Sequence, residues 1–97
     1  MVTLDILQRE KREEIVRLAE QHGCRNVRVF GSVATGESKD TSDVDFLVDL
    51  DKGRGLLDLG GLVSDLQNLL GVEVDLVESG CIHPYIRNRV LSEAVPL

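Results

Sequence analysis

The chain has 97 residues, a formal net charge of −6, 3% aromatic residues and no Trp. This length predicts one domain over residues 1–97. The negative charge disfavours nonspecific binding to nucleic acid or an anionic membrane, and the few aromatic side chains disfavour a base-stacking surface. No apolar run approaches the length of a membrane span, and two cysteines do not make a disulfide scaffold. We therefore expect a cytoplasmic protein with free thiols that binds neither nucleic acid nor membrane.

The first half of the chain predicts one helix and two strands. Leu4–His22 is charged, with apolar residues spaced three and four apart on one face, and Gly23 marks its end. Residues 26–30 and 43–50 alternate between apolar and polar, which predicts two strands. The polar stretch Thr35–Ser42 predicts the loop between them and allows antiparallel pairing.

The second half predicts a helix, a strand and a helix. Residues 56–70 carry a stripe of leucine and valine, in which Gly60 and Gly61 suggest a close approach to the sheet. Residues 72–78 predict a third strand, parallel to the second because the connection is long enough for a crossover. Residues 84–94 predict a last short helix that begins at a proline. The order α-β-β-α-β-α predicts an α+β domain with a small mixed three-stranded sheet flanked by helices.

Two carboxylates stand at the start of the second predicted strand. Asp43 and Asp45 are two residues apart, so a strand places both side chains on one face. Gly31 and Ser32 end the first strand and lie next to this pair if the two strands are antiparallel. Carboxylates hold Mg²⁺, glycine lets the backbone approach a phosphate, and a Ser hydroxyl and nearby N–H groups donate to phosphate oxygens. The combination predicts phosphoryl or nucleotidyl transfer.

A third candidate acid is Asp75, whose neighbours Val74 and Leu76 point to the opposite face of their strand. A second metal ion would need such a ligand, because two metal ions about 3.5–4 Å apart can clamp the attacking and leaving oxygens of an in-line displacement. Asp75 can also help to deprotonate the attacking hydroxyl. Its distance from Asp43 and Asp45 depends on the sheet register, which the sequence pattern leaves open.

These residues carry a resemblance to a known family. Phe30-Gly31-Ser32, a gap of ten residues and Asp43-Val44-Asp45-Phe46 resemble the signature of the polymerase-beta-like nucleotidyltransferase superfamily. The short length and the stretches GSVATGE, TSDVDFLV and EVDLVE are similar to the minimal nucleotidyltransferase (MNT) group. The resemblance implies that Gly31 and Ser32 hold the nucleotide phosphates, that Asp43 and Asp45 ligate Mg²⁺, and that Asp75 is the third acid. One difference is Thr35, where many members carry Arg, so a phosphate or partner contact of that loop is in question.

The resemblance also implies a function and a partner. MNT proteins are the smaller members of two-gene toxin–antitoxin modules, paired with a helical HEPN ribonuclease toxin. This implies an antitoxin that uses ATP and two Mg²⁺ ions to transfer AMP to a tyrosine hydroxyl of the toxin. A chain of this size has no room for an acceptor domain, so the partner would supply the acceptor. The alternatives are a binding module that neutralises its partner by occlusion alone and, less favoured, transfer to a small molecule such as an aminoglycoside.

Each acid also has a simpler structural explanation. Asp43 and Asp45 alone are explained by the solvated face of a half-buried strand, and Asp75 by a solvated edge strand. The nearby Gly-Ser pair and Asp75 favour the functional interpretation of Asp43 and Asp45, whereas that of Asp75 depends on the sheet register. Asp49 and Asp51 continue the alternation, but we interpret them as the end of the strand and the start of a turn, outside the site.

The two cysteines and two histidines offer a rival metal site. His22, Cys24, Cys81 and His83 are formally enough ligands for a structural zinc. The spacing within each pair is a single residue, which is tighter than usual, and His22 fits the apolar face of the first helix. We therefore favour structural roles for these four residues.

Overall fold

The computed structural model describes residues 2–37 and 43–97. Its regular elements in chain order are α1 (Leu4–Arg9), α2 (Arg12–Gln21), β1 (Cys24–Phe30), α3 (Gly31–Thr35), β2 (Val44–Leu50), α4 (Leu56–Leu70), β3 (Val74–Glu78), the 3₁₀ turn η1 (Ser79–Cys81), α5 (Pro84–Glu93) and β4 (Val95–Pro96). The predicted loop Thr35–Ser42 begins at the end of α3, and its residues 38–42 lie outside the described residues.

The strands form one mixed sheet in the order β3-β2-β1-β4. β1 is antiparallel to β2 and to β4, whereas β2 and β3 are parallel. The α+β class and the three predicted strands with their directions are confirmed. The fourth strand was not predicted, because two residues ending in a proline show no alternation. Directly after this strand, the Leu97 N–H donates to the Val27 carbonyl of β1 at 3.1 Å and holds β4 in position.

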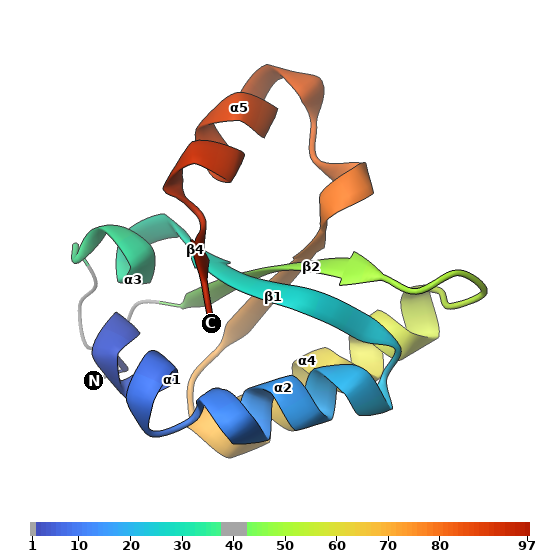
Figure 1. Ribbon diagram of the computed structural model, residues 1–97, viewed down its shortest axis with the longest axis horizontal. Coiled ribbons are helices and arrows are strands. Elements are labelled where there is room, and N and C mark those ends of the chain that lie inside the picture. The colour runs from blue at the N-terminus through green and yellow to red at the C-terminus, as the bar shows by residue number, and fades with distance from the viewer. Residues whose placement is uncertain (1, 38–42) are drawn as a thin grey trace.

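Helices cover the two faces of the sheet unequally (Figure 1). α1, α2 and α4 lie on one face, and α5 lies on the other. Strand β2 contributes to both cores because its side chains alternate. On the side of α1, α2 and α4, the larger core includes the fully buried residues Leu7, Ile15, Phe46, Leu62 and Leu66. On the side of α5, the smaller core is Leu47, Ile82 and Val90, with Phe30, Val77 and Ala94 packed against it.

The single helix predicted over Leu4–His22 is wrong, because the chain forms α1 and α2 instead. The break falls inside Gln8–Glu14, a run of polar residues with no apolar side chain to hold a continuous helix against the sheet. Leu7 of α1 and Ile15 of α2 are both fully buried on either side of the break. The bend therefore lets both segments reach the core.

The expected approach of the α4 glycines to the sheet is also wrong. A Cβ on Gly61 would lie 2.7 Å from the His22 imidazole at the end of α2, whereas Gly60 has nothing within 4 Å. The same imidazole lies 2.6 Å from a carboxylate oxygen of Asp65 on α4. Gly61 thus makes room for a polar contact that joins two helices.

A matched pair of substitutions on α4 tests the placement of the larger core. Leu66 is 1% exposed and Leu57 is 94% exposed. We expect Leu66→Ala to lower the free energy of unfolding by about 2–5 kcal/mol, because it leaves a cavity in the core. Leu57→Ala on the same helix should change it by less than about 0.5 kcal/mol. Urea unfolding measures both, and equal losses would contradict this packing.

Candidate active site

The register of the sheet brings the predicted acids together. Asp45 of β2 pairs with Asp75 of β3 in the parallel ladder and with Phe30 of β1 in the antiparallel ladder. Asp43 is exposed and lies two residues earlier, just before β2. Asp45 has the same orientation as Leu47, which packs in the smaller core. The acids therefore lie at one end of the sheet, on the face that carries α5.

Gly31 lies directly beside Asp45. It follows β1 with a φ of +72°, and a Cβ at this position would collide with the Asp45 carboxylate. Glycine is required here for both reasons, since it tolerates a positive φ and has no Cβ to clash with the carboxylate. The next residue, Ser32, is half-buried, and its carbonyl accepts the Glu37 N–H at 2.9 Å. The Gly-Ser pair and the acids are thus neighbours, as the sequence predicted.

Negative charge is concentrated at this point. Burial, the charge of Asp75 and the charge of Asp43 all raise the pKa of Asp45. Over residues 2–37 and 43–97, none of the ion pairs involves Asp43, Asp45 or Asp75. Within the described residues, the three carboxylates therefore have no basic side chain to neutralise them.

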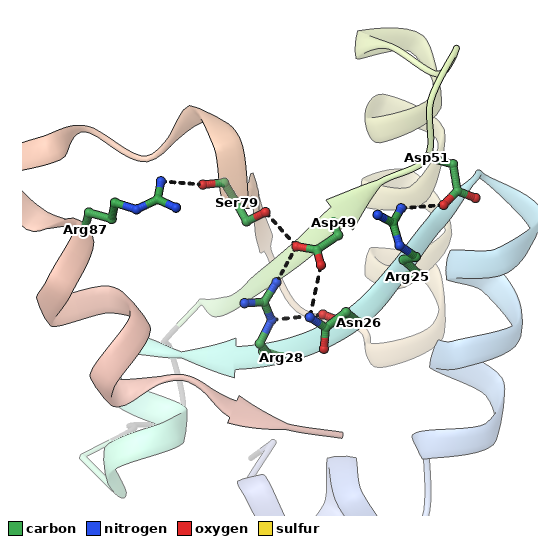
Figure 2. A network of polar contacts seen from close by, with 7 residues as sticks. All are labelled: Arg25, Asn26, Arg28, Asp49, Asp51, Ser79 and Arg87. Carbon is green, nitrogen blue, oxygen red and sulfur yellow. Dashed lines mark hydrogen bonds and ion pairs between the residues drawn. The ribbon is translucent and has the colours of Figure 1, made fainter.

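Asp49 lies on the same face of β2 but has a different environment, shown in Figure 2. Its carboxylate accepts hydrogen bonds from Ser79 Oγ at 2.6 Å, Arg28 Nη2 at 2.7 Å and Asn26 Nδ2 at 3.0 Å. The hydrogen bond from Ser79 is the largest of the effects that lower the pKa of Asp49. Asp49 is thus part of a structural network and, as predicted, not of the acid cluster.

Mg²⁺ is the metal that the donor set fits. In the described part of the chain, no three His, Cys, Asp or Glu side chains are arranged to hold a metal ion by themselves. Mg²⁺ does not require this, because it usually takes one or two carboxylates and completes its shell with water and substrate phosphates. Asp45 and its two acidic neighbours carry hard oxygen donors of this kind.

The rival zinc site does not form. Cys24 is buried in the larger core, whereas Cys81 is exposed on η1, and both are free. His22 contacts Asp65, and the His83 Nδ1 accepts the Tyr85 N–H at 3.1 Å. The four side chains thus have separate contacts and do not converge on one point.

Among residues 2–37 and 43–97, no helix is long and apolar enough to cross a membrane.

A cleft beside the acids was not predicted from the sequence. This α5 cleft has a volume of about 310 Å³, and Asp75 forms part of its wall together with Cys81 and His83. The i, i+4 spacing of Ile86 and Val90, both in α5, is a helical pattern that could have indicated one wall of this cleft. Its apolar lining consists of Phe30, Val77, Ile82, Ile86 and Val90.

Two substitutions on one face of β2 test the contrast between its acids. At pH 7 without divalent cations, Asp45→Asn should raise the free energy of unfolding, because it removes a partly buried charge that Asp75 and Asp43 repel. Asp49→Asn should lower it by about 1–3 kcal/mol, because Arg28 loses its charged partner. Urea unfolding of the two variants and the wild type measures both changes.

The contributions of Asp45 and Asp49 to stability depend on pH in opposite directions. Folding raises the pKa of Asp45, so the cost of ionising it is absent below its unfolded pKa and grows as the pH rises through its folded pKa. Folding lowers the pKa of Asp49, so its stabilisation is present above its unfolded pKa and is lost as the pH falls through its folded pKa. The differences in free energy of unfolding between the wild type and each of the two variants should both vanish below the folded pKa of Asp49. A less stable Asp45→Asn at pH 7 would contradict the charge cluster.

Comparison of the sequence with known proteins gives a consistent result. Residues 9–97 match the nucleotidyltransferase domain family. Protein adenylyltransferase MntA of Thermococcus cleftensis is 41% identical over an alignment 99 positions long. The alignment covers 98% of this chain and 96% of that protein. A Methanocaldococcus jannaschii protein provisionally named protein adenylyltransferase MJ0435 is 42% identical over 86 residues, 89% of this chain and 92% of that protein.

Solved structures agree with the sequence comparison. One, described provisionally as a minimal nucleotidyltransferase, has a TM-score of 0.86 and 46% identity, and the match covers 99% of this chain and 97% of that one. A toxin–antitoxin structure with AMP-PNP has a TM-score of 0.74 at 21% identity, over 87% of this chain and 69% of that one, which establishes a shared fold only. The chain belongs to the nucleotidyltransferase domain family, a family of enzymes, and within it to the minimal nucleotidyltransferases.

Proposed function

We propose that this chain is a Mg²⁺-dependent protein adenylyltransferase that transfers AMP from ATP to a tyrosine hydroxyl of a helical HEPN-type toxin and so acts as its antitoxin. The observation that carries the proposal is the cluster of Asp43, Asp45 and Asp75 beside Gly31, where negative charge has no basic partner among the described residues. The relatives named protein adenylyltransferases support the reaction. Toxin–antitoxin structures of the same fold support the kind of partner.

Each residue of the site has a proposed role. Gly31 and Ser32 bind the triphosphate, since the backbone at a glycine can approach a phosphate closely and the Ser hydroxyl can donate to a phosphate oxygen. Asp43 and Asp45 hold Mg²⁺, and Asp75 is the ligand for a second ion. When bound there, Mg²⁺ supplies positive charge that stabilises the phosphoryl oxygens and the leaving pyrophosphate.

The proposed reaction is an in-line displacement. The tyrosine oxygen forms a bond to the α-phosphorus as the bond to pyrophosphate breaks, and the hydroxyl proton leaves the oxygen. Asp75 is exposed and pairs with Asp45 in the sheet, which supports its alternative role as the base that accepts that proton. We place the reaction in the cytoplasm, in keeping with the two free cysteines.

Intact mass of the partner tests the reaction. The chain is mixed with the protein encoded by its neighbouring gene, Mg²⁺ and ATP, and the partner mass should increase by whole AMP units. Asp45→Asn should slow this transfer by at least about a hundredfold, because the negative charge of the ligand is lost. Asp51→Asn is the matched control. Asp51 pairs with exposed Arg25 away from the cluster, so this variant should retain the wild-type rate.

The same experiment separates catalysis from occlusion. Transfer by Asp45→Asn at the wild-type rate would contradict the metal assignment. An unchanged partner mass, with a stable complex that also forms with Asp45→Asn, would replace the proposal with a binding module that acts by occlusion alone. If the partner mass does increase, replacing each tyrosine of the partner by phenylalanine identifies the acceptor.

A further inference from the structure

The α5 cleft is an apolar cavity that opens beside the acid cluster. Its walls come from three parts of the fold, namely Phe30 on β1, Val77 on β3, and Ile86 with Val90 on α5. Its volume of about 310 Å³ is at the lower end of the range for small-molecule sites. The proposed reaction, as described so far, assigns no role to this cavity.

The wall formed by η1 and α5 is held in place by the Asp49 network (Figure 2). Asp49 accepts the hydrogen bond from Ser79 Oγ, and the Ser79 carbonyl accepts one from Arg87 Nη1 at 3.2 Å. The network thereby joins β2 to the first residue of η1 and to α5. Arg28 of β1 joins the same carboxylate with its side chain only 14% exposed. The network therefore anchors this wall of the cleft to the sheet.

The cleft is continuous with the proposed triphosphate site. Asp75 belongs to both, because it lines the cleft and pairs with Asp45 in the sheet. Phe30 lines the cleft, pairs with Asp45 and directly precedes Gly31. A group that is joined by a short tether to phosphates at Gly31 can reach the cleft. The opposite face of the sheet is filled by the larger core.

We infer that the α5 cleft binds the heterocyclic base of the donor nucleoside triphosphate, with Phe30, Val77 and Ile86 against its faces. The inference rests on the proposed function, since it places the base of the same nucleotide whose phosphates lie at the acids. A base is planar and largely apolar on its faces, which suits this lining. Its ring nitrogens require a polar partner at the rim, and His83 offers one. Because the His83 Nδ1 accepts the Tyr85 N–H, the neutral imidazole carries its proton on Nε2 and can donate it.

Two residues of α5 provide a matched test. Ile86 lines the cleft and is 46% exposed, whereas Leu91 on the same helix is 39% exposed and outside the lining. The probes are ATP and inorganic tripolyphosphate, each titrated calorimetrically with Mg²⁺ present. Ile86→Ala should weaken ATP binding about five- to tenfold, because apolar contact with the base is lost, and should leave tripolyphosphate binding unchanged. Leu91→Ala should change neither.

The outcomes distinguish this inference from the proposed function. Unchanged ATP binding by Ile86→Ala, or equal weakening of ATP and tripolyphosphate, would overturn the cleft assignment while the triphosphate site stands. A wild-type chain that binds neither probe would overturn the proposed function and this inference with it.

The exposed thiol of Cys81 allows a second test without any substitution in the lining. Cys81 is in the cleft wall, whereas Cys24 is buried, so a maleimide should label one site. A hydrogen bond to Glu78 raises the pKa of Cys81, so labelling is best followed at mildly alkaline pH. ATP with Mg²⁺ should slow the labelling about fivefold or more, and tripolyphosphate should not. Equal labelling rates with and without ATP would overturn the cleft assignment.

Discussion

The structure depends on one electrostatic constraint, which is that three carboxylates are held together without a basic partner among the described residues. Pairing with β1 and β3 fixes Asp45 between Phe30 and Asp75, and Asp43 precedes it by two residues. Burial, together with repulsion from Asp75 and Asp43, raises the pKa of Asp45, and the packing of the sheet holds the three carboxylates together. Such an arrangement lowers stability by itself and would be relieved by a bound cation, in keeping with the tendency of perturbed pKa values to cluster at functional sites.

The two faces of the sheet differ in what they carry. The face under α1, α2 and α4 carries the larger core and supplies most of the buried apolar surface. The other face has a smaller core, and along it charge and apolar surface lie side by side at the acids and the α5 cleft. Asp49 lies on this face too, but its three donors satisfy it. The contrast between Asp45 and Asp49 on one strand separates a carboxylate with no basic partner among the described residues from one that a hydrogen-bond network satisfies.

Much of the site could be read from the sequence because it is local. The Gly-Ser pair and the Asp-x-Asp lie at strand ends, where period-two geometry and a short connection already bring them together. The pairing of Asp75 with Asp45 could not be predicted, since parallel register is set by the packing of α4 and not by alternation. The α5 cleft and the pairing of Asp49 with Ser79 and Arg28 were missed for a similar reason. They join residues distant in sequence through tertiary packing, as does the two-residue strand β4.

The central claim is that the acid cluster is a cation site, and thermal unfolding under rising Mg²⁺ concentration tests it most directly. Potassium chloride holds the ionic strength constant, so that general screening does not contribute. If Mg²⁺ binds the folded chain at this cluster, the wild type and Asp51→Asn should gain several degrees in Tm, and Asp45→Asn should gain little or nothing. An equal rise in Tm for the wild type and Asp45→Asn, or no rise in the wild type, would contradict the account.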